Sequence, residues 1–235
     1  MAQNKKINFV PLIILLIVVA FLLSYGKFLQ KNYYQKSPSV TTSLSGVPSS
    51  IPATTSCGPN KFSSSEIENS LHLGKVTAPI VMEVFSDYQC PWCSRYWLDT
   101  LKQVLPDYIN QGKVCLIYRE LAFEGERSQW GAEAAYCANE QGKFWEFHNK
   151  LFANQSGLNE VKVQEIAKEL GLNQDRFNQD LSDPRLKSLI EREMGHARQA
   201  EIRAVPSIFV NGKLRNIRGF PDLQQAVENE LRKKK

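Results

Sequence analysis

The sequence predicts an α/β fold in which a helical insertion separates two groups of strands. Three short runs rich in apolar and β-branched residues, at residues 80–86, 113–119 and 207–210, are typical of buried strands. Between the second and third runs, at about residues 126–202, apolar residues recur at helical spacing and glycines mark the breaks. The expected order is therefore strand, helix, strand, helical insertion, β-hairpin, helix.

Each element of this order follows from a local pattern. A helix is expected to begin at Pro91 after the first strand, because apolar residues recur at helical spacing from Trp92 onward and proline is tolerated in a first helical turn. The Asn211-Gly212 pair predicts a hairpin turn, and Pro221 opens the last helix. The helices predicted within the insertion span residues 131–141, 144–153, 160–170 and 184–202.

The residues before the domain are predicted to form an anchor and a linker. Residues 9–26 are apolar, uncharged and just long enough to cross a bilayer, so we expect a transmembrane helix behind a cytoplasmic N-terminus at 1–8. A cleaved secretory signal is the alternative, because small residues lie at 24–26. Residues 27–60, rich in Ser, Thr and Pro, are expected to be a disordered linker. One domain is then expected at 61–235.

Composition and charge favour neither a nucleic-acid partner nor an organic cofactor. The formal net charge is +5, and part of it comes from the basic run at residues 232–235, which is typical of a solvated tail. The sequence has no glycine-rich phosphate-binding loop, since Gly212 belongs to the predicted hairpin turn. We therefore expect no nucleic-acid partner and no cofactor.

Cys90 and Cys93 stand apart from the other cysteines because only Pro91 and Trp92 separate them. A cysteine at a helix N-terminus has its thiolate stabilised by free backbone N–H groups and the positive end of the helix dipole. Cys93 lies one turn further on, close enough to form a disulfide with Cys90, so the pair predicts a dithiol redox site. The alternatives are a fixed disulfide or half of a zinc site, but no paired His or Cys spacing completes the latter, and no metal is expected.

Three separated motifs together resemble the DsbA-like thiol-disulfide oxidoreductases of the thioredoxin superfamily. The motifs are FSDYQCPWC, CANEQGKFWEFHNKLF at residues 137–152 and AVPSIFVNGK at residues 204–213. Their order makes the resemblance specific, and it covers roughly residues 74–231. It implies a thioredoxin fold with an inserted helical subdomain and no cofactor.

The resemblance also implies roles for single residues. Cys90 is similar to the exposed nucleophile of the family and Cys93 to its resolving cysteine. Val205 and Pro206 resemble the loop whose cis-proline faces the disulfide, where the backbone before the proline binds an extended substrate. Glu83 resembles the buried acid that relays protons, although a strand residue facing a polar edge is the alternative.

Trp92 is a departure from the family pattern, because the most studied oxidants have histidine before the second cysteine. An imidazole there helps to stabilise the thiolate. Because this chain has Trp92 instead, the sequence does not determine the direction of electron flow. Trp92 and Pro91 also border the site, where Trp92 fits either a substrate platform or simple packing. We expect an oxidase that introduces disulfides. A tethered disulfide reductase or isomerase and a non-catalytic peptide-binding module are the alternatives.

The resemblance implies two kinds of partner: unfolded or newly exported proteins with cysteines, and a membrane quinone-linked oxidase, DsbB-like or VKOR-like, for reoxidation. Disulfides persist outside the cytoplasm, so we expect a single-pass protein of the cell membrane with its domain extracytoplasmic.

The remaining cysteines allow one further prediction. A structural disulfide between Cys115 and Cys137 would join the second strand to the first helix of the insertion. The alternative is two buried free thiols that act as small apolar residues. Cys57, at the end of the linker, is interpreted as incidental or paired between molecules.

Overall fold

A five-stranded mixed sheet forms the centre of the computed structural model, which describes residues 70–233. Its order is β1 (Leu71–Leu73), β3 (Val114–Glu120), β2 (Ile80–Ser86), β4 (Ser207–Val210) and β5 (Lys213–Arg215). Only β2 and β3 run parallel, and the other neighbouring strands are antiparallel. This is a thioredoxin-like α/β fold with a helical insertion.

The segment between β2 and β3 is helical but irregular. It starts as α3 (Pro91–Arg95), passes through the π-helical segments η2 (Tyr96–Leu101) and η3 (Leu105–Ile109), and includes the short α4 (Lys102–Val104) between them. After β5, α10 (Phe220–Arg232) ends the described part of the chain. Both α3 and α10 have a proline in their first turn, where the missing N–H group has no helical partner.

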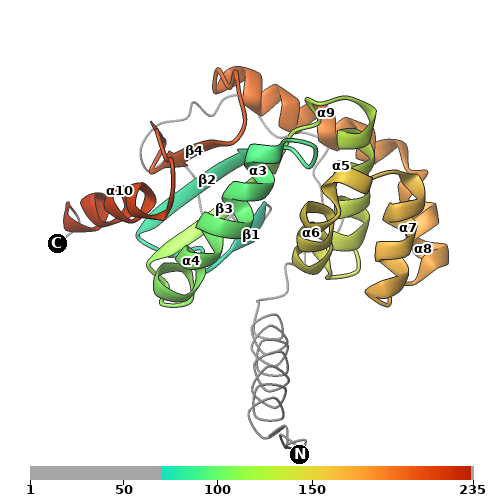
Figure 1. Ribbon diagram of the computed structural model, residues 1–235, viewed down its shortest axis with the longest axis horizontal. Coiled ribbons are helices and arrows are strands. Elements are labelled where there is room, and N and C mark those ends of the chain that lie inside the picture. Colours follow the sequence, from blue (N-terminus) through green and yellow to red (C-terminus); the bar gives the residue numbers. More distant parts are fainter. Residues whose placement is uncertain (1–69, 234–235) are drawn as a thin grey trace, which may run out of the picture. The chain divides into compact units, whose positions relative to one another are not determined.

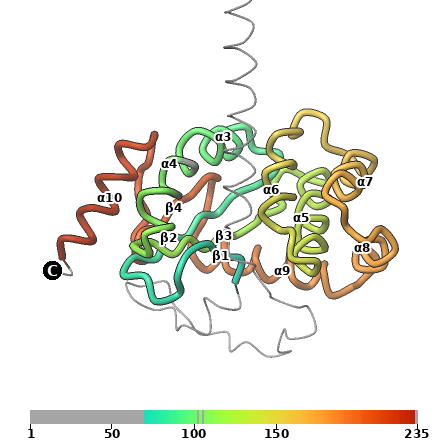
Figure 2. Tube along the Cα trace, turned by 90° about the horizontal axis from the view of Figure 1, so that it is seen from below, coloured from blue at the N-terminus to red at the C-terminus, as the bar shows by residue number. Residues whose placement is uncertain are grey.

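The insertion between β3 and β4 consists of helices that gather beside the sheet (Figure 1). Figure 2 shows α10 on one side of the strands, with α5, α6, α7 and α8 on the other. The helical segments of the insertion are α5 (Glu126–Asn139), α6 (Phe144–Ala153), η4 (Gln155–Gly157), α7 (Glu160–Glu169), α8 (Gln174–Leu181) and α9 (Pro184–Gln199).

The two faces of the sheet bury different side chains because residues alternate along each strand. On one face, Tyr118 of β3 contacts an aromatic cluster that joins the active-site segment to α6; the other members are Tyr88, Trp97, Phe144, Trp145 and His148. On the other face, Phe85 and Phe209 pack edge to face near Ala197 of α9. The Tyr118 face therefore connects the insertion to the cysteine pair.

Most predicted elements are confirmed, with differences at the ends and two omissions. The strands at Ile80–Ser86 and Ser207–Val210 and the helix at Phe144–Ala153 have the predicted bounds. The sequence prediction omitted β1, whose three residues are too short for a periodic pattern, and α8. In α8 only Phe177 is buried, so its pattern is almost entirely polar.

The predicted anchor at residues 9–26, the linker at 27–60 and Cys57 lie outside the described residues. Within residues 70–233, no helix combines the length and the apolar character needed to cross a bilayer.

The predicted disulfide between Cys115 and Cys137 is not formed: both are free, buried thiols. Cys115 and Ile117 of β3 pack against Val81 of β2. Cys137 lies on α5, among the helices of the insertion. Both cysteines thus act as small apolar residues, which was the alternative interpretation, and burial raises the pKa of Cys115 to about 12.

Candidate active site

Cys90 is the residue that caps the N-terminus of α3. Its backbone is extended, with φ −72° and ψ 115°, and Pro91 follows as the first helical residue. The carbonyl oxygen of Cys90 accepts hydrogen bonds from the N–H groups of Cys93 (3.1 Å) and Ser94 (3.2 Å). The side chain of Cys90 therefore lies at the end of the helix where backbone N–H groups have no helical acceptor.

The structure shifts the pKa values of the two thiols in opposite directions. A hydrogen bond from the Cys93 side chain, helped by the backbone N–H groups of Cys93 and Trp92, lowers the pKa of Cys90 from 9.0 to about 7. Burial, and next the hydrogen bond to Cys90, raise the pKa of Cys93 far above its usual value. At pH 7 the Cys90 thiol of the reduced pair is thus about half ionised, and above that pH it is mostly thiolate, whereas Cys93 stays a thiol.

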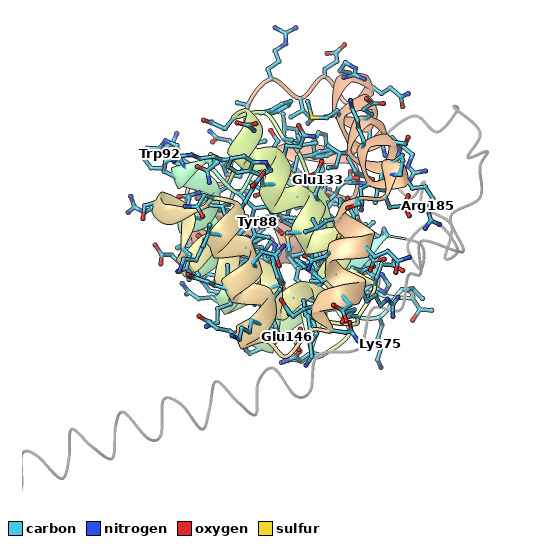
Figure 3. All side chains as sticks on the ribbon, turned by 90° about the vertical axis from the view of Figure 1, so that its right-hand side faces the viewer. Lys75, Tyr88, Trp92, Glu133, Glu146 and Arg185 are labelled. Atoms are coloured by element: carbon cyan, nitrogen blue, oxygen red, sulfur yellow. The ribbon has the colours of Figure 1, made fainter. Side chains whose placement is uncertain are left out.

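The surroundings of Cys90 correct the expectation of an exposed nucleophile. Only 4% of Cys90 is exposed, because the thiol faces the loop before β4. Next to it, Trp92 is 66% exposed and projects at the edge of the domain in Figure 3. Phe123, whose N–H group donates to Asp87, is 41% exposed. Exposed apolar side chains therefore lie beside the cysteine pair.

The loop before β4 meets the cysteine pair. The Val205–Pro206 peptide bond is cis, as the resemblance implied. The Cys90 thiol donates a weak hydrogen bond of 3.5 Å to the carbonyl oxygen of Val205. The structure thus brings Cys90, Cys93, Pro91 and Trp92 of the α3 segment together with Val205 and Pro206.

Glu83 does not join this group. Its Oε1 accepts a hydrogen bond of 2.9 Å from Nε of Arg119, which also contacts Glu193 of α9 at 3.3 Å. Glu83 lies two residues from Phe85 on β2, on the sheet face that packs against α9. The proton relay predicted for Glu83 has no support in this position, and the residue is part of a buried ion-pair cluster.

Glu120, at the end of β3, is the buried carboxyl group on the side of the cysteine pair. It pairs with Ser86 of β2 in the sheet register. Its Oε1 accepts from the N–H group of Tyr88 (3.1 Å), and its Oε2 accepts from the hydroxyl of Tyr118 (2.5 Å). Burial, and next the charge of Asp87, raise the pKa of Glu120 well above its usual value.

Asp87 holds the loop that leads to Cys90. One carboxylate oxygen accepts from the N–H group of Gln89 (2.7 Å) and the hydroxyl of Ser128 (2.7 Å), and the other from the N–H groups of Phe123 and Glu124. The sequence analysis missed both Asp87 and Glu120. The only signal was that each acid sits at or just after the carboxyl end of a parallel strand, where functional groups of such sheets gather.

Within residues 70–233, no cluster of three or more His, Cys, Asp or Glu side chains is arranged to hold a metal ion.

Comparisons with known proteins agree with this geometry. The family model described as Thioredoxin matches residues 66–229. The probable disulfide bond formation protein D of Bacillus anthracis is 31% identical over 170 residues, which cover 68% of this chain and 78% of that protein.

Two solved structures resemble the chain. BdbD from Bacillus subtilis, in its oxidised form, is 26% identical with a TM-score of 0.67, and the match covers 76% of this chain and all of that chain. A thioredoxin-like oxidoreductase from Silicibacter pomeroyi is 30% identical with a TM-score of 0.63, covering 70% and 93% of the two chains.

Proposed function

We propose, on the premise that this chain belongs to the thioredoxin family and is a DsbA-like thiol-disulfide oxidoreductase, that it works as an oxidase which introduces disulfides into other proteins. The observation that carries the proposal is the contrast between the thiols. Cys90 has a pKa of about 7 and Cys93 a strongly raised one. The lowered pKa of Cys90 stabilises the reduced pair relative to an ordinary dithiol and makes Cys90 a good leaving group, which supports transfer of electrons from substrate thiols to the pair. The nucleophile of the reductant thioredoxin has a similar pKa, so the reduction potential is the property that separates the two directions.

The proposed reaction starts from the Cys90–Cys93 disulfide. A substrate thiolate attacks the sulfur of Cys90, a mixed disulfide forms, and the electron pair of the broken S–S bond stays on Cys93. Cys93 then takes up a proton, because its buried thiolate is unfavourable. A second substrate thiolate attacks the substrate sulfur of the mixed disulfide. The substrate disulfide forms and Cys90 leaves as a thiolate, so two electrons pass to the pair.

Glu120 is proposed as the buried acid that exchanges a proton with Cys93. The side chain of Ser86 interacts with both Cys93 and Tyr118 and lowers the pKa of each, and the hydroxyl of Tyr118 donates to Glu120. This chain of hydroxyl groups leads from the resolving sulfur to a carboxyl group whose raised pKa keeps its proton available. Glu83, held by Arg119, has no comparable chain among the described residues.

The cellular part of the proposal extends the sequence analysis. Newly exported proteins with reduced cysteines are the proposed substrates, and a membrane quinone-linked thiol oxidase is proposed to reoxidise the pair. The domain is proposed to lie outside the cytoplasm, tethered by residues 9–26, because disulfides persist there. A reporter fused after Lys235 should then be active outside the cytoplasm, and activity confined to the cytoplasm would contradict this arrangement.

The test of the function is capture of substrates. Replacing Cys93 with Ala removes the competitor for the mixed disulfide, so proteins bound through Cys90 should accumulate, whereas Cys90→Ser should capture none. The purified wild-type protein should also form disulfides in a reduced, unfolded test protein. If the wild-type pair neither oxidises thiols nor reduces disulfides, and Cys93→Ala captures nothing, the domain is a binding module instead.

A further inference from the structure

Gln155, in the η4 turn of the insertion, holds the backbone on both sides of Gln89. Its Nε2 donates to the carbonyl oxygens of Tyr88 (2.7 Å) and Cys90 (2.9 Å). One carboxamide group thus bonds the nucleophilic cysteine's own carbonyl group and the carbonyl group two residues before it. Neither residue is near Gln155 in the sequence, and the sequence analysis gave no sign of the contact.

The insertion contacts the same segment through two more hydrogen bonds. The Gln89 side chain donates to the carbonyl oxygen of Gln155 (3.3 Å), so Gln155 and the loop bond each other reciprocally. The Ser94 hydroxyl, one turn into α3, donates to the carbonyl oxygen of Phe152 at the end of α6 (3.4 Å). The junction of α6 and η4 is therefore hydrogen-bonded to the chain both before and after Cys90.

The carbonyl group of Cys90 matters because it starts the helix. The N–H groups of Cys93 and Ser94 donate to it, and the N–H group of Cys90 itself donates to the carbonyl oxygen of Asp87 (3.2 Å). The N–H groups that stabilise the Cys90 thiolate belong to this same first turn. Fixing the Cys90 carbonyl group therefore fixes the direction of the N–H groups around the sulfur.

We propose that Gln155 is a positioning residue through which the helical insertion sets the reactivity of Cys90. The inference deepens the proposed function, on which it rests. Gln155 does not touch the sulfur in this arrangement, and it acts by holding the first turn of α3. The insertion is then part of the redox site.

Gln155 is neutral, so it acts by geometry and adds no net charge. The groups that face the Cys90 sulfur and affect its titration are Cys93, the first-turn N–H groups and the carboxylate of Glu124, which raises the pKa. Glu120 also interacts with the charge of Cys90. Loss of the Gln155 carboxamide leaves all these groups in the chain, so any change in the acidity of Cys90 reports their orientation.

The experiment measures the pKa of Cys90 in the reduced full-length protein, from thiolate absorbance and from the pH dependence of alkylation. Gln155→Ala should raise the pKa by about one unit, which lowers the thiolate fraction about tenfold below the pKa. Because a more basic thiolate is a better nucleophile, alkylation there should slow about threefold. Gln155→Glu keeps the shape, removes the donors and adds a negative charge, so it should raise the pKa further.

Gln141→Ala is the matched control. The Gln141 carboxamide also makes two hydrogen bonds to the backbone: it accepts from the N–H group of Asn173 (2.8 Å) and donates to the carbonyl oxygen of Asn173 (3.2 Å). Unlike the contact of Gln155, this contact joins two residues of the insertion and does not reach the Cys90 segment. This control should leave the pKa of Cys90 unchanged, even if it lowers the melting temperature.

Two results would overturn the inference: an unchanged pKa in Gln155→Ala, or an equal rise in Gln141→Ala. If Gln155→Ala fails to fold, Gln155→Met, which keeps the length of the side chain without its donors and without adding a charge, decides alone. The wild-type protein is assayed for disulfide formation in parallel. An inactive wild-type protein would refute the proposed function. If the wild-type protein is active but the Gln155 variants keep the wild-type pKa of Cys90, only the role of Gln155 is refuted.

Discussion

The thiol of Cys90 lies 3.5 Å from the carbonyl oxygen of Val205, so the reactive sulfur sits directly against the loop that leads into β4. These two residues are 115 positions apart in the chain, and the whole insertion lies between them. Trp92, two residues after Cys90 in the chain, is 66% exposed. The predictions below follow from this arrangement.

The first prediction concerns pH. The pKa of Cys90 is lowered from 9.0 to about 7 by folding, so its thiolate stabilises the folded reduced protein. This contribution grows as the pH rises from about 7 toward 9 and is lost as the pH falls through 7. The oxidised protein has no Cys90 thiol and lacks this contribution.

The free energy of unfolding of the reduced form, relative to that of the oxidised form, should therefore increase between pH 6 and pH 8.5, roughly in proportion to the pKa shift. Denaturant unfolding of both forms at several pH values measures it. Above about pH 9 the raised pKa of Cys93 acts in the opposite direction, so the comparison stays below that value. A difference that stays flat across the range would mean that the Cys90 pKa is unshifted.

The second prediction separates substrate binding from chemistry. Trp92 is 66% exposed, so Trp92→Ala should change the stability by less than about 0.5 kcal/mol. It should slow oxidation of an unfolded protein several-fold more than oxidation of a small dithiol, because only the larger substrate uses the apolar surface. Val161→Ala is the control, since Val161 is 67% exposed on α7, away from the cysteine pair. Equal slowing with both substrates would assign Trp92 to the chemistry of the pair instead.

The third prediction contrasts two buried acids. Glu83→Gln leaves Arg119 with Glu193 as its remaining partner, so it should lower the free energy of unfolding by about 2 kcal/mol. It should not alter the rate of disulfide exchange. Glu120→Gln keeps the shape and a hydrogen-bonding group but cannot exchange a proton, so it should slow turnover about tenfold or more with little loss of stability.

Chemical denaturation and stopped-flow oxidation of the same two variants measure both effects. The opposite pattern, with slow exchange in Glu83→Gln and normal exchange in Glu120→Gln, would restore the relay first predicted from the resemblance.

The fold was largely predictable because its main elements have strong local patterns. The buried strand at Ile80–Ser86 is a continuous apolar run, and Phe144–Ala153 carries an aromatic face at helical spacing. β1 pairs with β3 through only three residues, and the single buried side chain of α8 is Phe177, so tertiary packing determines both elements. The break of the first long helix into π-helical segments was not predicted, although Pro106 in η3 lacks the N–H group that a regular helix uses.

The candidate site was predictable only where chemistry is local. Cys90 and Cys93 are three positions apart, within one helical turn, and spacing alone indicated their pairing. Glu120, Asp87 and Gln155 reach the pair from other segments, and their roles depend on sheet register and on how the insertion packs. The resemblance suggested Glu83 as the buried acid, but strand alternation directs it to the other face, toward Arg119.

The reduction potential of the Cys90–Cys93 couple tests the central claim most directly. Equilibration of the purified protein with glutathione buffers of defined ratio, followed by thiol trapping, measures it. An oxidase should have a potential well above the value of about −270 mV that is typical of the reductant thioredoxin. A potential at or below about −270 mV would contradict the oxidase and assign the pair to disulfide reduction.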